Sequence, residues 1–281
     1  MNKTFEKEFY KTRDDVLEEL IQNKNNWNMF LHYWARILDS YSVDNILNLC
    51  SYNKSGRCYH TFDEWNSEEI GRRIKPKSRG IPICINNYKE YVFDIGQTYG
   101  KEYIIWNYNH ISDKELEYYY SDKYNIKYDN NLDKDKTNYI IFNNVVSEHI
   151  SNNYNNLTDD EREFTINAVT SLFLSKARYN LYSFDESYNS INKLDNEQLL
   201  KCMQVANKET MNIYKEFREN ENTLSRVRKY MIDEILNKAK QGQELSDEEF
   251  LELLDIEDEN DLEKLFEVAC EIRDNQSKVI K

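Results

Sequence analysis

The residues with the clearest chemical character lie in a short segment, residues 71–81, which we call the basic loop. It reads Gly-Arg-Arg-Ile-Lys-Pro-Lys-Ser-Arg-Gly-Ile and contains five basic residues and no acidic one. In an extended backbone, alternate side chains share one face at a spacing of roughly 6.5 Å. The cations expected on one such face are Arg73, Lys75, Lys77 and Arg79. A row of cations of this kind can follow a phosphate backbone.

The basic loop also has a purely structural explanation. Proteins protect exposed sheet edges with Lys and Pro, which keeps those edges from pairing with other chains, and Pro76 argues against a central strand. Two aromatic residues before the loop, Tyr59 and Trp65, offer base-stacking surfaces, but a lone helical tryptophan more often belongs to a core. The residues alone therefore leave a binding site and a protected edge both open.

The net charge of −14 argues against a nucleic-acid partner, because phosphate binding needs a basic surface. Its distribution reverses that inference. Residues 244–274 contain fourteen acidic residues against only Lys264 and Arg273, so this tail carries −12 and the rest of the chain about −2. The basic loop lies in that nearly neutral remainder.

Hydrophobic periodicity predicts the elements that position the basic loop. Directly after it, apolar residues alternate with other residues around Asn86 and Asn87, which predicts a β-hairpin. The alternating residues are Ile81, Ile83, Ile85, Tyr91, Phe93 and Ile95, and residues 104–106 are expected to add a third strand. Helical spacing predicts helices over residues 4–22, 27–38, 44–50, 62–70, 113–127, 138–153, 159–180, 196–219 and 223–241, with two more in the tail.

These elements predict an α+β fold that is mostly helical, with a small antiparallel, hairpin-based sheet in the N-terminal half. We expect three domains: residues 1–110, residues 135–242 and an acidic helical tail, residues 243–281. The first boundary is soft and falls between residues 110 and 135. The basic loop then belongs to the first domain and the acidic residues to the third.

Several functional classes lack their sequence signatures. The five cysteines are odd in number and far apart, which argues against a disulfide framework and a zinc site. No H-E-x-x-H motif, Walker loop or G-x-S-x-G elbow occurs. We therefore expect a non-enzymatic protein with no catalytic residue, metal or cofactor. With no signal-like or long apolar segment, it is expected in the cytoplasm and not in a membrane.

Four ordered blocks within residues 41–100 resemble those of a known DNA-binding domain. Tyr41-Ser42 with Asn45 is similar to Tyr-Ser-x-x-Asn, and Trp65 lies where a Trp precedes a basic loop. The loop itself resembles Gly-Arg-x-Val-Lys-Lys-Gly-x-Lys-Gly-Ile, and residues 93–100 resemble Phe-Asp-Val-Ser-Gln-Thr-x-Gly. On these blocks the segment resembles the N-terminal domain of ArdC-type antirestriction proteins, also found at the front of mobile-element helicases.

The resemblance implies a protein of a plasmid, transposon or phage that binds single-stranded DNA with low sequence specificity. The nucleic-acid-binding residues it implies, together with the basic residues of the loop, are Tyr41, Asn45, Arg57, Trp65, Arg72, Arg73, Lys75, Lys77 and Arg79. Asp94, Gln97 and Gly100 are expected to fix the hairpin and its turn instead. Two departures weaken the match: residues 52–54 replace a Gln-x-Pro, and Lys77 replaces the central glycine of the loop.

The acidic tail supports a different prediction. An antirestriction or anti-defence inhibitor can bind a host protein, or another protein of the mobile element, by presenting acidic side chains as a DNA mimic. A third alternative is that these residues form the front of a longer helicase-like polypeptide. The sequence leaves these alternatives open.

Overall fold

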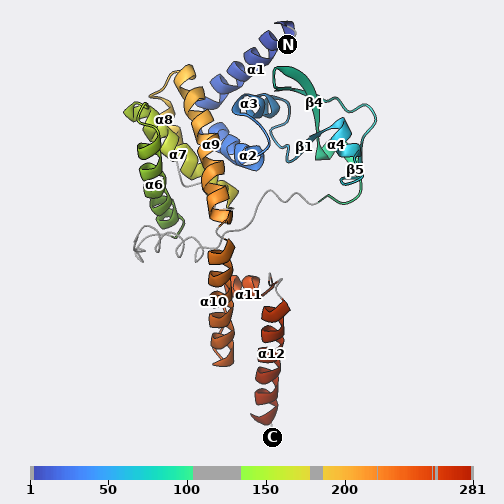
Figure 1. Ribbon diagram of the computed structural model, residues 1–281, viewed down its shortest axis with the longest axis vertical. Helices are drawn as coiled ribbons and strands as arrows, with labels where there is room; N and C mark the ends of the chain where they lie inside the picture. Colours follow the sequence, from blue (N-terminus) through green and yellow to red (C-terminus); the bar gives the residue numbers. More distant parts are fainter. Residues whose placement is uncertain are drawn as a thin grey trace. The chain divides into compact units, whose positions relative to one another are not determined.

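The computed structural model describes residues 3–103, 134–177, 186–219, 221–254, 256 and 259–279, which belong to two compact units, Met1–Lys215 and Glu216–Lys281 (Figure 1). Helices predominate, and the strands lie in the N-terminal half. The predicted α+β class is therefore confirmed. The predicted boundary between residues 110 and 135 falls almost entirely outside the described residues, as do the predicted helix at 113–127 and the strand at 104–106.

The first unit begins with three helices that form the frame for the sheet. They are α1 (Lys3–Ile21), α2 (Lys24–Ile37) and α3 (Val43–Tyr52). Asn23 is the N-cap of α2, and its side chain accepts hydrogen bonds from the first free backbone N–H groups of the helix. Its apolar face buries Trp27, Phe30 and Trp34, as their helical spacing predicts.

The sheet structure consists of two small antiparallel parts. Strands β1 (Tyr59–Thr61), β4 (Tyr88–Asp94) and β3 (Ile81–Ile85) form one sheet in that order, and β2 (Arg72–Ile74) pairs with β5 (Thr98–Gly100) in a two-stranded ribbon. The predicted hairpin is confirmed, since Ile85 pairs with Tyr88 across two residues with positive φ, Asn86 at 50° and Asn87 at 66°. Asparagine tolerates this left-handed backbone better than most residues.

The hydrophobic alternation gives the buried face of β3 correctly but not that of β4. Ile81 and Ile83 are buried, and Ile81 pairs with Val92, which is also buried. Tyr91 has the opposite phase and is 48% exposed. Cross-strand partners share a face, and the register set by the Asn-Asn turn places Val92 opposite Ile81. Val92 therefore lies on the buried face, and the aromatic residues that the sequence pattern places there do not.

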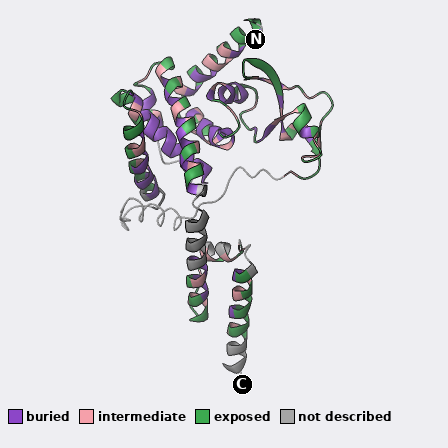
Figure 2. Cartoon of the chain, viewed as in Figure 1, coloured by how far each residue is buried: buried purple, intermediate pink, exposed green. Residues whose placement is uncertain are grey.

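The remaining described helices of the first unit lie either beside the strands or around one buried helix. They are α4 (Phe62–Asn66), α6 (Lys134–Asn153), α7 (Asp159–Lys176), α8 (Glu186–Ile191) and α9 (Asn196–Glu219). Helix α7 is buried along most of its length (Figure 2). It packs on α2, where the ring centroids of Trp27 and Phe164 lie 5.9 Å apart. Residues from the first and second predicted domains therefore pack together within one unit.

The second unit contains α10 (Glu221–Lys240), α11 (Asp247–Leu254) and α12 (Glu259–Val279). Its core is formed by Ile232 and Leu236 of α10 with Val268 of α12. No helix in the described ranges is both long and apolar enough to cross a membrane. The acidic tail is thus folded onto α10 through a few apolar side chains.

Candidate nucleic-acid interface

The basic loop is extended only at its start. Strand β2 ends at Ile74, and the backbone N–H of Ser78 then donates to the carbonyl of Lys75 at 3.1 Å, which closes a four-residue turn. Pro76 has the fixed φ that suits the second position of such a turn, and Lys77 has a φ of 67° at the third. The predicted single row of four cations is therefore wrong, because this turn changes the direction of the chain.

One short motif after the hairpin holds the basic loop in place. Asp94 caps the 3-10 helix η1 (Ile95–Gln97), accepting from the N–H of Gly96 at 2.8 Å, while the Asp94 N–H donates to the Gln97 side chain at 2.9 Å. The Gln97 amide group in turn donates to the carbonyl of Arg79 at 3.0 Å. Asp94 and Gln97 therefore have structural roles, but they hold the turn after the hairpin and the end of the basic loop, and not the Asn86–Asn87 turn.

The same motif fixes the backbone at two further basic residues. The second carboxylate oxygen of Asp94 accepts from the N–H of Arg57 at 2.8 Å. The N–H of Lys75 donates to the carbonyl of Gln97 at 2.8 Å, and its ammonium group donates to the carbonyl of Gly96 at 2.7 Å. Basic residues far apart in the sequence are thereby brought around one turn of 3-10 helix.

Gly71 and Gly100 allow the β2–β5 ribbon to close at its end. Gly100 has a φ of 136°, and a Cβ added there would lie 2.8 Å from the carbonyl oxygen of Gly71. Such a contact is too short for any side chain, so only glycine fits this position. Gly100 thus has a structural role at the end of this ribbon and not in the β3–β4 hairpin.

The exposed cations around this motif lack carboxylate partners. They are Arg57, Arg73, Lys75, Lys77 and Arg79, and none forms an ion pair with another described residue. Cations elsewhere in the described chain commonly do, for example Lys54 with Glu19 at 2.6 Å. In a chain with a net charge of −14, these five cations come from two separate segments and are gathered around one short motif.

Arg72 has a structural role. Its guanidinium donates to the hydroxyl of Thr98 at 2.8 Å and to the carbonyls of Thr98 and Lys101. These bonds fasten β2 to β5, so most of its donors are occupied. We therefore leave Arg72 out of that set, whereas Lys75 uses one of its three ammonium N–H groups on the Gly96 carbonyl and keeps the others.

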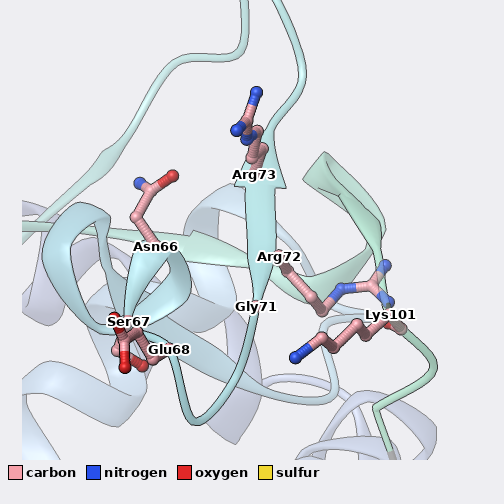
Figure 3. A pocket seen from close by; sticks show the side chains of 7 residues that line it. All are labelled: Asn66, Ser67, Glu68, Gly71, Arg72, Arg73 and Lys101. Carbon is pink, nitrogen blue, oxygen red and sulfur yellow. Dashed lines mark hydrogen bonds between the residues drawn. The ribbon is translucent and has the colours of Figure 1, made fainter.

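An open groove of about 510 Å³ lies between the end of α4 and β2 (Figure 3). Its basic lining residues are Arg72, Arg73 and Lys101, and Glu68 is the acidic one. Arg73 extends from the end of β2, away from Arg72 and Lys101 (Figure 3). The groove therefore adds Lys101, which lies just after β5, to the positive surface around the loop.

Two of the predicted DNA contacts are instead used within the protein. Asn45 is buried, and its side-chain amide pairs with the backbone of Cys84 through two hydrogen bonds of 2.8 Å. It completes the outer edge of β3 as a neighbouring strand does. The Tyr41 hydroxyl donates to the carbonyl of Tyr59 at 2.9 Å. Both residues join the helices to the sheet, and we leave them out of the interface.

Trp65 is fully buried. Its indole N–H donates to the carbonyl of Phe93 at 2.8 Å, and its ring packs edge-on against His60 and Tyr103. Tyr59 is also buried, with 3% of its surface exposed. Neither ring presents a face to a base, so the core interpretation of Trp65 holds and both residues leave the interface.

The sequence gives little sign of two exposed tyrosines beside the basic loop. Tyr99 pairs with Arg73 across the ribbon, and Tyr91 lies beneath Gly80 at the other end of the loop. These two residues are 49% and 48% exposed. Tyr99 stands within the Gln-Thr-x-Gly block, but its position opposite Arg73 follows only from the strand register.

Cys58 and His60 have the residue types of a reactive thiol–imidazole pair. The Cys58 thiol lies 3.5 Å from Nε2 of His60. Burial raises the pKa of Cys58 to about 11 and lowers the pKa of His60, so the thiol stays protonated at neutral pH. Among the described residues, no three His, Cys, Asp or Glu side chains gather to hold a metal.

No family model, curated protein or solved structure matches this chain. The ArdC resemblance of residues 41–100 therefore remains a prediction that depends on motif order and spacing.

Proposed function

We propose that this chain is a non-enzymatic protein that binds single-stranded DNA through the basic loop. One observation carries the proposal: five exposed cations without carboxylate partners are held around the Asp94–Gln97 motif on a strongly acidic chain. Unpaired cations on a fixed backbone can each bind a phosphate without first breaking an ion pair. A protected sheet edge does not require several cations from separate segments.

The form of this surface favours flexible single strands over a duplex. The cations project from a turn and a short ribbon, whereas duplex readers place a helix or a long ribbon in the major groove. Phosphate contacts carry no base information, so binding is expected to depend little on sequence. The ArdC resemblance independently implies single-stranded DNA and supplies the mobile-element context.

A titration of the purified chain against single-stranded and duplex oligonucleotides at several salt concentrations tests the proposal. We expect single strands to bind more tightly. Five phosphate contacts predict a log–log salt slope of about −3 to −4, because each contributes roughly −0.7 on single strands. Equal or tighter binding to blunt duplex, or a flat salt response, would remove the basic loop from the mechanism.

A matched pair of variants isolates the loop. The double variant Arg73→Ala, Lys77→Ala should reduce the salt slope by about 1.4 and weaken binding, with stability nearly unchanged because exposed charges contribute little to folding. Lys54→Ala, Lys193→Ala removes the same charge from two exposed sites that are ion-paired with Glu19 and Glu163. Comparable losses in both variants would point to general electrostatics instead of a site.

The acidic tail favours a second candidate function, a DNA mimic that inhibits a host defence protein. The observation behind it is the folded second unit, whose exposed acidic side chains include Glu244, Glu263, Glu267 and Glu271. A pull-down from host lysate with and without competing DNA separates the two proposals. A mimic should lose its partner when DNA is added, whereas a DNA-binding protein should itself capture that DNA.

A further inference from the structure

The β2–β5 ribbon has one face fixed to the protein and one face free. Arg72 bonds to the Thr98 hydroxyl at 2.8 Å, and Thr98 is 3% exposed, so these side chains mark the inner face. Side chains alternate along each strand. Arg73 and its partner Tyr99 therefore lie together on the outer face.

The ring of Tyr99 is available to a ligand. The residue is 49% exposed, and its side chain has no hydrogen bond, ring contact or cation contact with another described residue. Directly opposed residues in an antiparallel pair have Cβ atoms about 4.5 to 5.5 Å apart. An open aromatic ring and an unpaired guanidinium are thus adjacent on the outer face of the ribbon.

The other aromatic residues near the loop do not offer this combination. Trp65 and Tyr59 are buried. The ring of Tyr91 is approached by the ammonium group of Lys89 at 4.8 Å, which occupies one of its faces. Among these four, only Tyr99 pairs an exposed ring with a cation on the neighbouring strand.

We propose that Tyr99 is the stacking platform for an unpaired base whose phosphate is bound by Arg73. The inference rests on the proposed function and adds the contact that selects single strands. A base within a duplex is stacked on both sides and cannot lie on the ring, whereas every unpaired base can. In this proposal Arg73 positions the nucleotide through its phosphate, and the Tyr99 ring stacks only on a base that is unpaired.

The test compares a base-containing strand with an abasic one. Oligo(dT) and an abasic deoxyribose-phosphate strand of equal length carry the same phosphates, and only the first can stack. Tyr99→Ala should bind oligo(dT) about ten-fold more weakly, the effect expected for loss of one stacked base, and should bind the abasic strand as wild type does. Tyr99→Phe should restore wild-type affinity for oligo(dT).

Tyr88→Ala is the matched control, since Tyr88 is 71% exposed but lies at the hairpin turn of the other sheet, in β4. It should leave binding to both strands unchanged. Unaltered oligo(dT) binding by Tyr99→Ala, or equal losses on both strands, overturns the stacking role while leaving phosphate binding in place. If the wild-type protein binds neither strand, both the stacking role and the proposed function fail.

Discussion

Lys77 combines a positive charge with a left-handed backbone at the tip of the basic loop. Its φ of 67° costs a non-glycine residue roughly 1–2 kcal/mol, and the ArdC-type motif that the loop resembles has glycine at this point. A residue that strains the turn but adds a cation is easier to understand in a phosphate-binding loop than in a protected edge. A substitution at Lys77 can therefore change the stability of the protein and its affinity for DNA in opposite directions.

Lys77→Gly should raise stability and lower DNA affinity together. Removing the strain gains about 1–2 kcal/mol, of which glycine loses about 0.5–1 kcal/mol through its greater freedom in the unfolded chain. The free energy of unfolding, measured by urea titration, should thus rise by roughly 0.5–1 kcal/mol, while the salt slope falls by about 0.7. Lys77→Ala is the control, because it removes the charge and keeps the strain. A less stable Lys77→Gly protein would contradict this account of the turn.

Trp65 should act through folding and not through DNA. Replacing this fully buried side chain by alanine removes its packing and its hydrogen bond to Phe93, so Trp65→Ala should lower the free energy of unfolding by roughly 3–5 kcal/mol. Thermal or urea unfolding measures the loss. A stable Trp65→Ala protein with weakened DNA binding would restore the stacking role that the sequence suggested.

The Asp94–Gln97 motif works at the scale of an element, because it joins the hairpin to the basic loop. Gln97→Ala removes the bond to the Arg79 carbonyl and frees that end of the loop. We expect a modest loss of stability, about 1 kcal/mol, and several-fold weaker binding, since the loop must then be ordered when DNA binds. An unchanged affinity would show that the loop needs no prior ordering.

The pairing of α6 and α9 depends on an almost fully buried carboxylate. Glu209 accepts hydrogen bonds from Tyr154 at 2.6 Å and Asn212 at 3.1 Å and lies 2.7 Å from Nε2 of His149. Burial alone would raise the pKa of Glu209, but these hydrogen-bonding partners lower it to about 2. The folded state thus favours the ionised carboxylate more than the unfolded state does.

Stability should therefore fall with pH below about 4.5. The ionised carboxylate contributes roughly 3 kcal/mol above its unfolded pKa, and this contribution is lost as pH falls toward 2. Urea unfolding of wild type and Glu209→Gln checks the linkage: the variant should be much less stable at neutral pH, and the gap should narrow in acid. If the difference in unfolding free energy between wild type and Glu209→Gln does not change with pH, the shape of the glutamine side chain, and not the lost charge, destabilises the variant.

How much the sequence predicts depends on whether a feature is local. The Asn86–Asn87 turn and the Trp27 face of α2 follow from short-range rules and were predicted correctly. The burial of Asn45 and the pairing of Tyr99 with Arg73 depend on strand register and on a helix packed against a sheet edge. The spacing of the cations within residues 71–81 does not predict the Lys75–Ser78 turn that separates them.

At the scale of the whole molecule, the basic loop and the acidic tail carry opposite charges, so the proposed DNA binding would be favoured by the loop and opposed by the tail. In α12 of the tail, Leu265, Val268 and Ile272 pack against α10, whereas Phe266 is 68% exposed. Deleting the tail would uncover Ile232 and Leu236 of α10. Neutralising exposed acids therefore tests the tail more cleanly than truncation.

The triple variant Glu244→Gln, Glu263→Gln, Glu267→Gln removes three negative charges from exposed side chains and spares the apolar cluster. Because a chain with a net charge of −14 repels a polyanion, we expect the variant to bind single-stranded DNA a few-fold more tightly at low salt. The advantage should vanish near physiological salt, where charges more than about 8 Å apart are largely screened. Binding measured across a salt series checks this. Identical affinities at low salt would show that the tail does not oppose DNA, and its acidic surface would then be better explained as a protein-binding one.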